Sequence, residues 1–295
     1  MKRLPGLKVM DRLENFSALD PLVNTARSLV ERALGPRWLR DVLHGVPLGH
    51  PVHPLAVQVP LGAWVSGGVL DLVPGTERPA RILVGTGLLG ALPSAAAGYA
   101  DWSKLHEQQL RVGIVHSASN VLATGLYAAS LVQRCRGRHG SGKALSYTGL
   151  LLAGAGGYLG GHLAYRQAAG ANHTEDIPHR FPTGWQHLAP LDELDEGTLG
   201  QRVVSGVPLL VHRRGEQVDV LADTCSHLSA PLHEGRLLDG SGDGPGDACV
   251  ECPWHQSVFA LGTGEVVHGP ATAGQPRFET RIVGEAVEVR LPHAG

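Results

Sequence analysis

The stretches CSH at residues 225–227 and CPWH at residues 252–255 decide the fold of the C-terminal third of this 295-residue chain. Each stretch places one thiol and one imidazole within three positions of each other, so each must form a tight loop. A single C-x-H is a weak signal, but two such half-sites joined by a Gly-rich segment are specific. The sequence therefore predicts one metal centre with four ligands: Cys225, His227, Cys252 and His255.

Two kinds of centre use two thiolates and two imidazoles. One is a Cys2His2 zinc site. The other is a [2Fe–2S] cluster, with Cys225 and Cys252 on one iron and His227 and His255 on the other. Zinc spacings usually pair Cys with Cys and His with His, whereas here each Cys is followed closely by its own His. The spacing therefore favours the cluster, which is an electron-transfer centre.

Residues 188–292 are similar to a Rieske ferredoxin domain. The resemblance implies a small all-β fold with two cluster-binding loops at one end. Short runs rich in β-branched residues, bounded by Gly, Pro or Asp, agree with that fold at 207–212, 218–221, 278–283 and 286–291. The segments that carry the resemblance are 188–197 (LAPLDELDEG), 206–215 (GVPLLVHRRG), 221–235 (LADTCSHLSAPLHEG) and 252–270 (CPWHQSVFALGTGEVVHGP).

Several positions depart from the pattern of quinol-oxidising Rieske proteins. Those proteins carry one more Cys in each loop, where this chain has Ala230 and Trp254. They also have a Ser and a Tyr that donate hydrogen bonds at the cluster. Ser257 matches the first, but Phe259 stands where the Tyr would be, so we expect a low reduction potential. Gln256 stands where Gly is usual.

Two other features of this region are not expected to bind the cluster. The Gly/Asp-rich stretch 239–247 is predicted to be a surface insertion. Cys249 is predicted to be a core thiol, because CPWH aligns on Cys252.

The N-terminal half has four long apolar stretches, at 55–73, 82–100, 112–132 and 144–165, in which only Asp71 is formally charged. Each is long enough to cross about 30 Å of hydrocarbon. A soluble Gly/Ala-rich bundle is the alternative, but soluble helices rarely stay uncharged for so long. The predicted fold is a membrane all-α four-helix bundle followed by an all-β Rieske domain.

Residues 40–170 are similar to a family of small bacterial four-helix membrane domains of uncharacterised function. The matching pieces are HPVHP at 50–54, Asp71, GYAD at 98–101, HSASN at 116–120 and GGHLAY at 160–165. The expected domains are an N-terminal amphipathic segment (1–45), a transmembrane domain (46–166), a linker (167–187) and the Rieske domain (188–295).

The N-terminal segment includes a predicted amphipathic helix at 20–34, which we expect to lie on the membrane surface. The polar linker is expected to be flexible, with its three His solvated. No cleavable signal peptide is visible, so we expect a multi-pass inner-membrane protein with both termini and the Rieske domain in the cytoplasm. Basic residues give conflicting cues on orientation: Arg27, Arg32, Arg37 and Arg40 on one side, Arg134, Arg136, Arg138 and Lys143 on the other.

Alternating helix directions place His53, His116 and His162 near one leaflet, and Asp101 joins them. Ionisable groups inside a membrane are functional candidates by default. Two facing His could ligate haem b, and three His with a carboxylate could hold another transition metal. The alternative is that these side chains only cap helices or bond to one another.

Two functions remain open on the sequence. One is a membrane-anchored carrier of single electrons between a redox partner protein and a membrane acceptor. The other is a non-catalytic redox sensor. A Rieske oxygenase is disfavoured, because no separate domain remains for its catalytic iron. The expected partners are a redox protein, the lipid membrane and a quinone, and not a nucleic acid.

Overall fold

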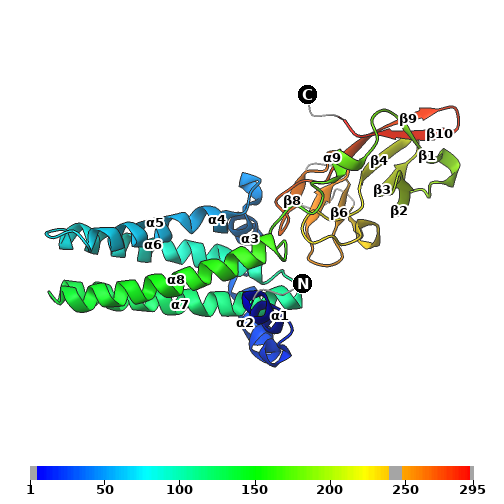
Figure 1. Ribbon diagram of the computed structural model, residues 1–295. Helices are drawn as coiled ribbons and strands as arrows, with labels where there is room; N and C mark the ends of the chain where they lie inside the picture. The colour runs from blue at the N-terminus through cyan, green and yellow to red at the C-terminus, as the bar shows by residue number, and fades with distance from the viewer. Residues whose placement is uncertain (1–4, 239–247, 293–295) are drawn as a thin grey trace. The chain divides into compact units, whose positions relative to one another are not determined.

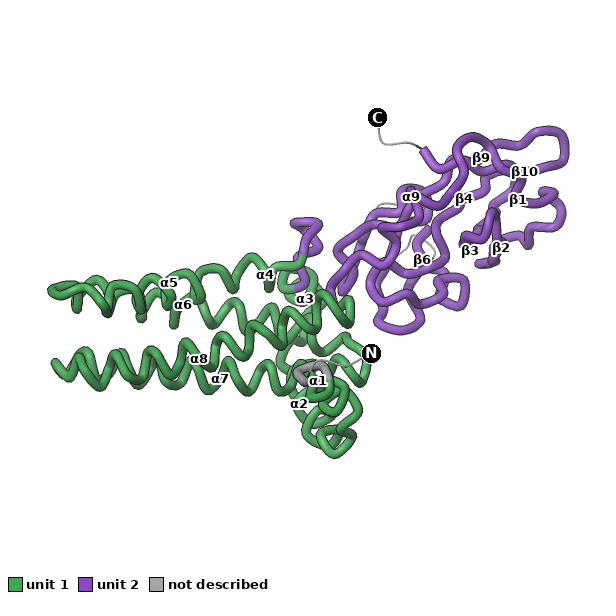
Figure 2. The backbone as a smooth tube through the Cα atoms, viewed as in Figure 1, with its two compact units in different colours: residues 1–43, 51–169 green, residues 44–50, 170–295 purple. Residues whose placement is uncertain are grey.

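The chain forms two compact units in the structure, a computed structural model that describes residues 5–238 and 248–292. The first unit comprises 1–43 and 51–169, and the second comprises 44–50 and 170–295 (Figure 2). Helices make up the first unit and strands dominate the second (Figure 1). The stretch 239–247, predicted to be a surface insertion, lies outside the described residues.

The helical unit contains α5 to α8, which pack side by side, and shorter helices that precede them (Figure 1). The four apolar stretches correspond to α4 with α5, then α6, α7 and α8. The bounds are α1 (Pro5–Glu14), α2 (Asp20–Ala33), α3 (Arg37–His44), α4 (Val52–Ala56), α5 (Gln58–Leu70), α6 (Glu77–Trp102), α7 (Glu107–Cys135) and α8 (His139–Tyr165).

Glycines let the long helices approach closely. A Cβ added at Gly87 of α6 would lie 2.1 Å from Nε1 of Trp64, and one at Gly149 of α8 would lie 3.0 Å from Tyr127. Trp64 of α5 and Tyr127 of α7 stack with ring centroids 4.0 Å apart. Aromatic rings therefore occupy the space that side chains at the glycines would fill, as in tightly packed membrane helices.

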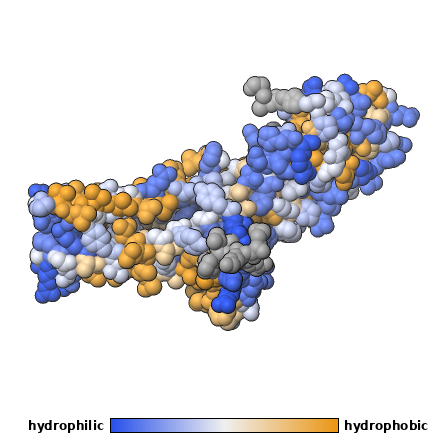
Figure 3. All heavy atoms as spheres, in the orientation of Figure 1, coloured by the Kyte–Doolittle hydropathy of each residue, from blue (hydrophilic) through white to orange (hydrophobic). Residues whose placement is uncertain are grey.

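The outward faces of these helices are apolar. Leu89 and Leu92 of α6 and Leu151 of α8 are each at least 69% exposed, as is Leu72 just after α5, and Figure 3 shows hydrophobic atoms spread along this unit. By length and composition, α6 is the one described helix that suits a membrane crossing. Four were expected. The first stretch is divided between α4 and a 13-residue α5, which is short for a span.

Ion pairs hold the N-terminal helices against the long ones. Arg111 of α7 binds both carboxylate oxygens of Asp20 at 2.6 and 2.8 Å and donates to the backbone carbonyl of Glu14. Lys104 lies 3.0 Å from Glu31 of α2. The helix predicted at 20–34 is present as α2, with Pro21 in its first turn, where its missing N–H costs nothing.

The β unit contains two antiparallel sheets. The larger has the strand order β1-β10-β9-β4-β3-β2, and the smaller has the order β5-β6-β7-β8. The four runs predicted to be strands are present as β3, β4, β9 and β10. The bounds are β1 (Gln186–Pro190), β2 (Leu199–Val204), β3 (Val207–Arg214), β4 (Gln217–Ala222), β5 (Arg236–Leu238), β6 (Cys249–Glu251), β7 (Val258–Ala260), β8 (Val266–His268), β9 (Arg277–Val283) and β10 (Ala286–Arg290).

Two apolar clusters stabilise this unit. One lies on the large sheet and includes Phe278, Val287 and Val289. The other joins the sheets, because Leu210 and Leu221 of the large sheet cluster with residues of the small one and with Cys225 and Cys252. Burial of this second cluster therefore holds together the two sheets from which the cysteine loops extend.

Asp219 is a buried carboxylate in β4. It accepts a hydrogen bond from Gln217 at 3.1 Å, and His212 and Arg214 lie 3.7 and 3.4 Å away. Burial raises the pKa of Asp219, but these polar and cationic neighbours together hold it below the usual value. The ionised form therefore stabilises the folded domain.

The segment expected to be a flexible linker is largely part of the β unit. It contains α9 (Ile177–Arg180), and the side chains of Ile177 and Phe181 are buried in the large sheet's cluster. The Phe181 ring meets Phe278 edge-on, with centroids 4.8 Å apart. His173 was expected to be solvated, but its ring bonds to Ser229 at 2.9 Å. Burial of two large apolar side chains explains why this polar stretch is ordered.

After α8 the chain passes from the first unit to the second within a short stretch, 170–172. The backbone N–H of Ala169 donates to Leu163 in α8, and that of His173 donates to Ser226 in the β unit. Bonds within the two units therefore leave fewer residues between them here than the 21 predicted for the linker at 167–187.

Candidate functional site

Cys225 and His227 lie on a loop that follows β4. The N–H of Cys225 donates to the carbonyl of Ala230 at 2.8 Å, and the N–H of Ser229 donates back to the carbonyl of Cys225 at 2.9 Å. These two bonds close a compact turn. Ser229 has a left-handed backbone, with φ of 65°.

Cys252 and His255 lie on a second loop, between β6 and β7, that is closed in the same way. The N–H of Cys252 donates to the carbonyl of Ser257 at 2.8 Å, and the N–H of Gln256 donates to the carbonyl of Cys252 at 3.2 Å. Gln256 also has φ of 65°. Glycine adopts this left-handed backbone most easily, which explains why Gly is usual at this position. The two half-sites are therefore matched in backbone structure as well as in ligand type.

The loops bring like ligands together. The side chains of Cys225 and Cys252 lie in one buried cluster, and their mutual interaction lowers the pKa of Cys252 to about 7 and raises the pKa of Cys225. The imidazole rings of His227 and His255 have centroids 5.0 Å apart. A thiol pair beside an imidazole pair is the donor set that a two-iron cluster with mixed ligation requires.

Burial differs between the two sides of the site. Cys225 and Cys252 are each 1% exposed and His227 is 8% exposed, whereas Trp254 beside His255 is 49% exposed. The rings of Trp254 and His255 have centroids 6.4 Å apart. The sulfur side therefore faces the protein core, and an exposed indole lies next to the imidazole side.

A buried carboxylate supports the first loop. Asp223 accepts hydrogen bonds from the backbone N–H of His233 and from the side chain of Gln201, both at 2.7 Å, and the His233 ring lies 2.7 Å from its second oxygen. This network, two residues before Cys225, was not predicted. The only sequence signal is a polar residue directly after a buried strand.

The segment 270–276 covers the first loop. Ser226 donates its hydroxyl to the carbonyl of Ala273 at 2.7 Å. The amide of Gln275, oriented to satisfy both partners, bonds to the carbonyl of Thr224 and the N–H of Ser226. This contact could not be predicted from the sequence, because Gln275 is 50 positions from Cys225.

The remaining predictions for this region concern three side chains. Ser257 is fully buried and accepts a hydrogen bond from the N–H of Ala271, so its own proton is available to another acceptor. Phe259 is also fully buried. Cys249 lies in β6, and none of the four cysteines forms a disulfide.

Within the helical unit, the structure brings together only part of the second predicted site. The rings of His53 and His116 have centroids 6.4 Å apart. His162 instead bonds Glu14 of α1 at 2.7 Å. Around His53 and His116, no third described His, Cys, Asp or Glu side chain joins them as for a metal ion. Of the four residues predicted to form one site, His53, His116, His162 and Asp101, the structure therefore brings together His53 and His116.

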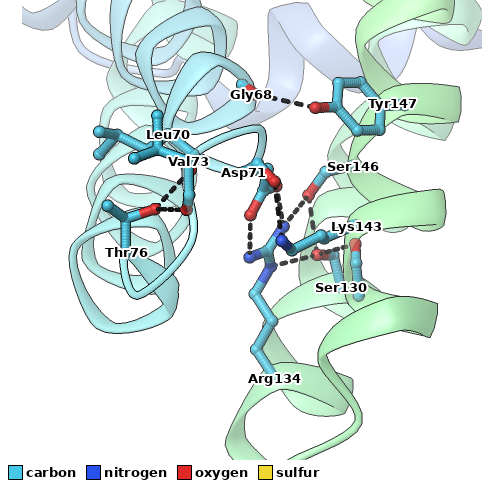
Figure 4. Close-up of polar contacts among 11 residues, drawn as sticks. Gly68, Leu70, Asp71, Val73, Thr76, Ser130, Arg134, Lys143, Ser146 and Tyr147 are labelled. Atoms are coloured by element: carbon cyan, nitrogen blue, oxygen red, sulfur yellow. Dashed lines mark hydrogen bonds and ion pairs between the residues drawn. The ribbon is translucent and has the colours of Figure 1, made fainter.

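Asp71, the charged residue of the apolar stretches, is paired with Arg134 at the end of α7 (Figure 4). Both side chains are at most 1% exposed. Arg134 also donates to Ser130 and Ser146, and Lys143 donates to the backbone carbonyl of Asp71 at 2.7 Å. Two of the four cations at the junction of α7 and α8, Arg134 in α7 and Lys143 in α8, are thus bound to Asp71.

Comparison with protein families supports both resemblances. The model of the Rieske [2Fe-2S] domain matches residues 184–279. The chain belongs to the Rieske [2Fe–2S] family. Residues 49–173 match a second family, described as predicted membrane protein (DUF2231).

Individual relatives match the Rieske domain. The ferredoxin subunit of anthranilate 1,2-dioxygenase from Burkholderia cepacia is 36% identical over 107 residues, which are 36% of this chain and 92% of the relative. Ferredoxin CarAc of Metapseudomonas resinovorans is 34% identical over 33% of this chain and 85% of its own length. The solved ferredoxin of carbazole 1,9a-dioxygenase from Nocardioides aromaticivorans IC177 is 26% identical, with a TM-score of 0.32, over 36% of this chain and 96% of that one.

These findings establish the coarse function of the β unit. It is a Rieske ferredoxin-type electron carrier, homologous to dioxygenase ferredoxin subunits, and the family implies a [2Fe–2S] cluster. The helical unit matches a family of predicted membrane proteins, and one of its described helices is suited to a crossing.

Proposed function

We propose that this protein is a membrane-anchored carrier of single electrons. Cys225 and Cys252 ligate one iron of a [2Fe–2S] cluster, and His227 and His255 ligate the other. The observation that carries this assignment is the pairing of thiol with thiol and imidazole with imidazole on two matched loops. When bound, the cluster supplies one-electron redox chemistry.

The protein's own residues prepare the site for ligation. Both cysteines must lose their protons, and the lowered pKa of Cys252 favours the first of these losses. The network of Asp223 and the cover by Gln275 restrain the first loop from two sides. These contacts fix ligand positions, which metal centres need from the residues around them.

Electrons enter and leave through a partner that docks on the exposed edge at Trp254. Tryptophan is a frequent hot spot of protein interfaces, and here it is half-exposed beside a proposed ligand. The relatives named as dioxygenase ferredoxin subunits support a redox protein as partner. An oxygenase component is the partner class that these names suggest.

The helical unit anchors this carrier in the lipid bilayer through α5 to α8. Exposed leucines on the long helices and the match to predicted membrane proteins support this proposal. The large side chains on the outward faces would otherwise remain in water, at a cost of about 1.5–3 kcal/mol each. The proposed domains begin with residues 1–45 beside the membrane and continue with the anchor at 46–166.

Both termini and the Rieske domain lie in the cytoplasm in this proposal. Arg134 and Lys143 are bound to Asp71, so they count less as surface charges that mark a cytoplasmic loop. Arg27, Arg32, Arg37 and Arg40, near the N-terminus, then dominate the distribution of basic residues. Reporter fusions at the two ends should therefore both report the cytoplasm.

Spectroscopy of the full chain tests the cluster assignment. The detergent-extracted protein should be red-brown and give a Rieske-type EPR signal on reduction. Cys252→Ser or His255→Cys should abolish that signal, whereas Cys249→Ser, which alters a cysteine outside the proposed ligand set, should leave it. A colourless protein that contains zinc would refute the proposal.

Electron transfer to a partner tests the docking edge. The reduced protein is mixed with anthranilate 1,2-dioxygenase, and oxidation of the cluster is followed by stopped flow. Loss of a hot spot costs about 2 kcal/mol or more, so Trp254→Ala should slow transfer about 30-fold or more. The control Val203→Ala removes another exposed apolar side chain and should have no effect. Equal rates for both variants would exclude Trp254 as the docking residue, and binding without transfer would favour a redox sensor.

A further inference from the structure

His53 of α4 and His116 of α7 are held in the same chemical state by neighbouring helices. Nδ1 of His53 lies 2.8 Å from the carbonyl oxygen of Ser94 in α6. Nδ1 of His116 lies 2.7 Å from the carbonyl oxygen of Gly156 in α8. A carbonyl oxygen only accepts, so each Nδ1 carries the proton, and each Nε2 has a lone pair.

Neither lone pair is used by a neighbouring side chain. The bond to Ser94 is the only hydrogen bond that His53 makes with the described residues. The amide nitrogen of Asn120 is 3.5 Å from Nδ1 and 3.3 Å from Nε2 of His116. An atom almost equidistant from both ring nitrogens lies beside the ring and not on the axis of the Nε2 lone pair. Both Nε2 atoms are therefore available to an acceptor of electron pairs.

The two rings cannot satisfy each other. In both rings Nδ1 carries the proton, so both Nε2 atoms are hydrogen-bond acceptors. Two acceptors cannot form a hydrogen bond with each other. Their centroids are 6.4 Å apart and their planes are nearly perpendicular, at 82°. A metal lies about 2.0–2.1 Å from an imidazole nitrogen, so two rings on opposite sides of one ion have centres about 6 Å apart. The observed spacing suits one ion between them.

Glycines on the adjacent helices make room for both rings. A Cβ on Gly98 of α6 would lie 2.7 Å from Nδ1 of His53, and a Cβ on Gly160 of α8 would lie 3.1 Å from Cε1 of His116. Larger residues would displace the imidazoles from the carbonyls that orient them. A bond from one imidazole nitrogen to a carbonyl is how metal-binding histidines are usually oriented.

His162 is a structural histidine and differs from His53 and His116. Its Nε2 bonds the carboxylate of Glu14, so that nitrogen is already engaged. It therefore serves as an internal control for the pair.

We propose that His53 and His116 are the two protein ligands of a transition-metal ion within the helical unit. With no third described His, Cys, Asp or Glu at this point, the other positions must come from outside the protein. The four nitrogens of a haem would fill them, as would water on a bare ion. The site is independent of the cluster. If the proposed function holds as well, a redox-active metal here is a membrane acceptor for its electrons.

Metal and haem analysis of the full chain in detergent tests this proposal. Wild-type protein is compared with His53→Gln, His116→Gln and His162→Gln. A glutamine amide can still donate to the carbonyls of Ser94 and Gly156, so folding is preserved as far as possible. Haem is quantified as the pyridine haemochrome, and iron, copper, nickel and zinc by mass spectrometry. Reduced Rieske EPR is recorded on each monodisperse sample.

The wild type and His162→Gln should each contain about one haem, or about one bare metal ion beyond the iron of the cluster. His53→Gln and His116→Gln should each lose at least nine-tenths of it while the Rieske signal persists. If one variant does not fold, the other decides. A wild type with only the cluster's iron, or a metal retained in either folded variant, would overturn the proposal. Loss of the Rieske signal alone would count against the cluster ligands and not against this site.

Discussion

Replacing Phe181 by alanine should destabilise the Rieske domain, although this residue lies outside the region first expected to fold. Its side chain is 6% exposed and meets Phe278 edge-on at 4.8 Å between centroids. Truncation of a buried phenylalanine to alanine costs about 3–5 kcal/mol, through lost burial and the cavity that remains. We expect a decrease of that size in the free energy of unfolding.

The assay is urea unfolding of a fragment that begins at Gly170. Unfolding is monitored through the visible absorption of its cluster. A second fragment that begins at Gly184 lacks both Ile177 and Phe181, which are buried in the same cluster. It should be less stable than the longer fragment by several kcal/mol, since each buried side chain contributes about 1.5–3 kcal/mol. The control is His179→Ala, whose side chain is 75% exposed and should matter by less than about 0.5 kcal/mol.

Two results would refute this reasoning. One is a change below about 1 kcal/mol for Phe181→Ala, which is outside the range for a buried phenylalanine. The other is equal stability of the two fragments. Either would mean that the segment before β1 is only a linker, as the sequence first indicated.

Four further changes have expected outcomes. Asp219 has a lowered pKa, so its stabilisation of the Rieske domain is complete at neutral pH and should fade below about pH 4 in acid-unfolding curves. Phe259→Tyr should raise the reduction potential, measured by voltammetry, if its hydroxyl donates to a cysteine sulfur. Gln256→Gly should raise the unfolding free energy by about 0.5–1 kcal/mol, because it relieves a left-handed backbone. Asp71→Asn should destabilise the helical unit in thermal unfolding by about 3–5 kcal/mol, because it leaves the charge of Arg134 buried and unpaired.

Matched variants provide the controls. The low-pH loss should be smaller in Asp219→Asn, and an unchanged pH profile would contradict the assignment. A potential that falls in Phe259→Tyr would show that no bond to sulfur forms. Gln256→Ala keeps the strain and should give no gain in stability. The double variant Asp71→Asn, Arg134→Gln should recover part of the lost stability, and no recovery would count against an unpaired charge as the cause.

The Rieske family was predictable from the sequence because the information is local. The loops place Cys225 beside His227 and Cys252 beside His255 in the chain itself, and their spacing distinguishes a mixed cluster from a zinc site. The runs of β-branched residues in β3 and β4 and the long apolar stretches are also local patterns. Each reports a backbone conformation or a solvent preference, which neighbouring residues largely determine.

The partners of polar side chains in the helical unit were not predictable in this way. Helix direction predicted that three histidines lie near one end. It did not predict which of them would meet. The structure pairs His162 with Glu14, 148 positions away, and leaves His53 facing His116. The burial of Arg134 against Asp71, 63 positions apart, removes a charge that the sequence suggested was at the surface.

The sequence alone determined the ligand types, the β-rich class of the C-terminal unit and the helices of the N-terminal one. Only the tertiary structure decided that residues 170–183 belong with the Rieske domain, that Asp223 supports its first loop and that two histidines form a pair. The physical reason is that spacing along the chain fixes local geometry. Contacts between distant residues depend on how whole helices and sheets pack, and that packing depends on shape and burial summed over many side chains.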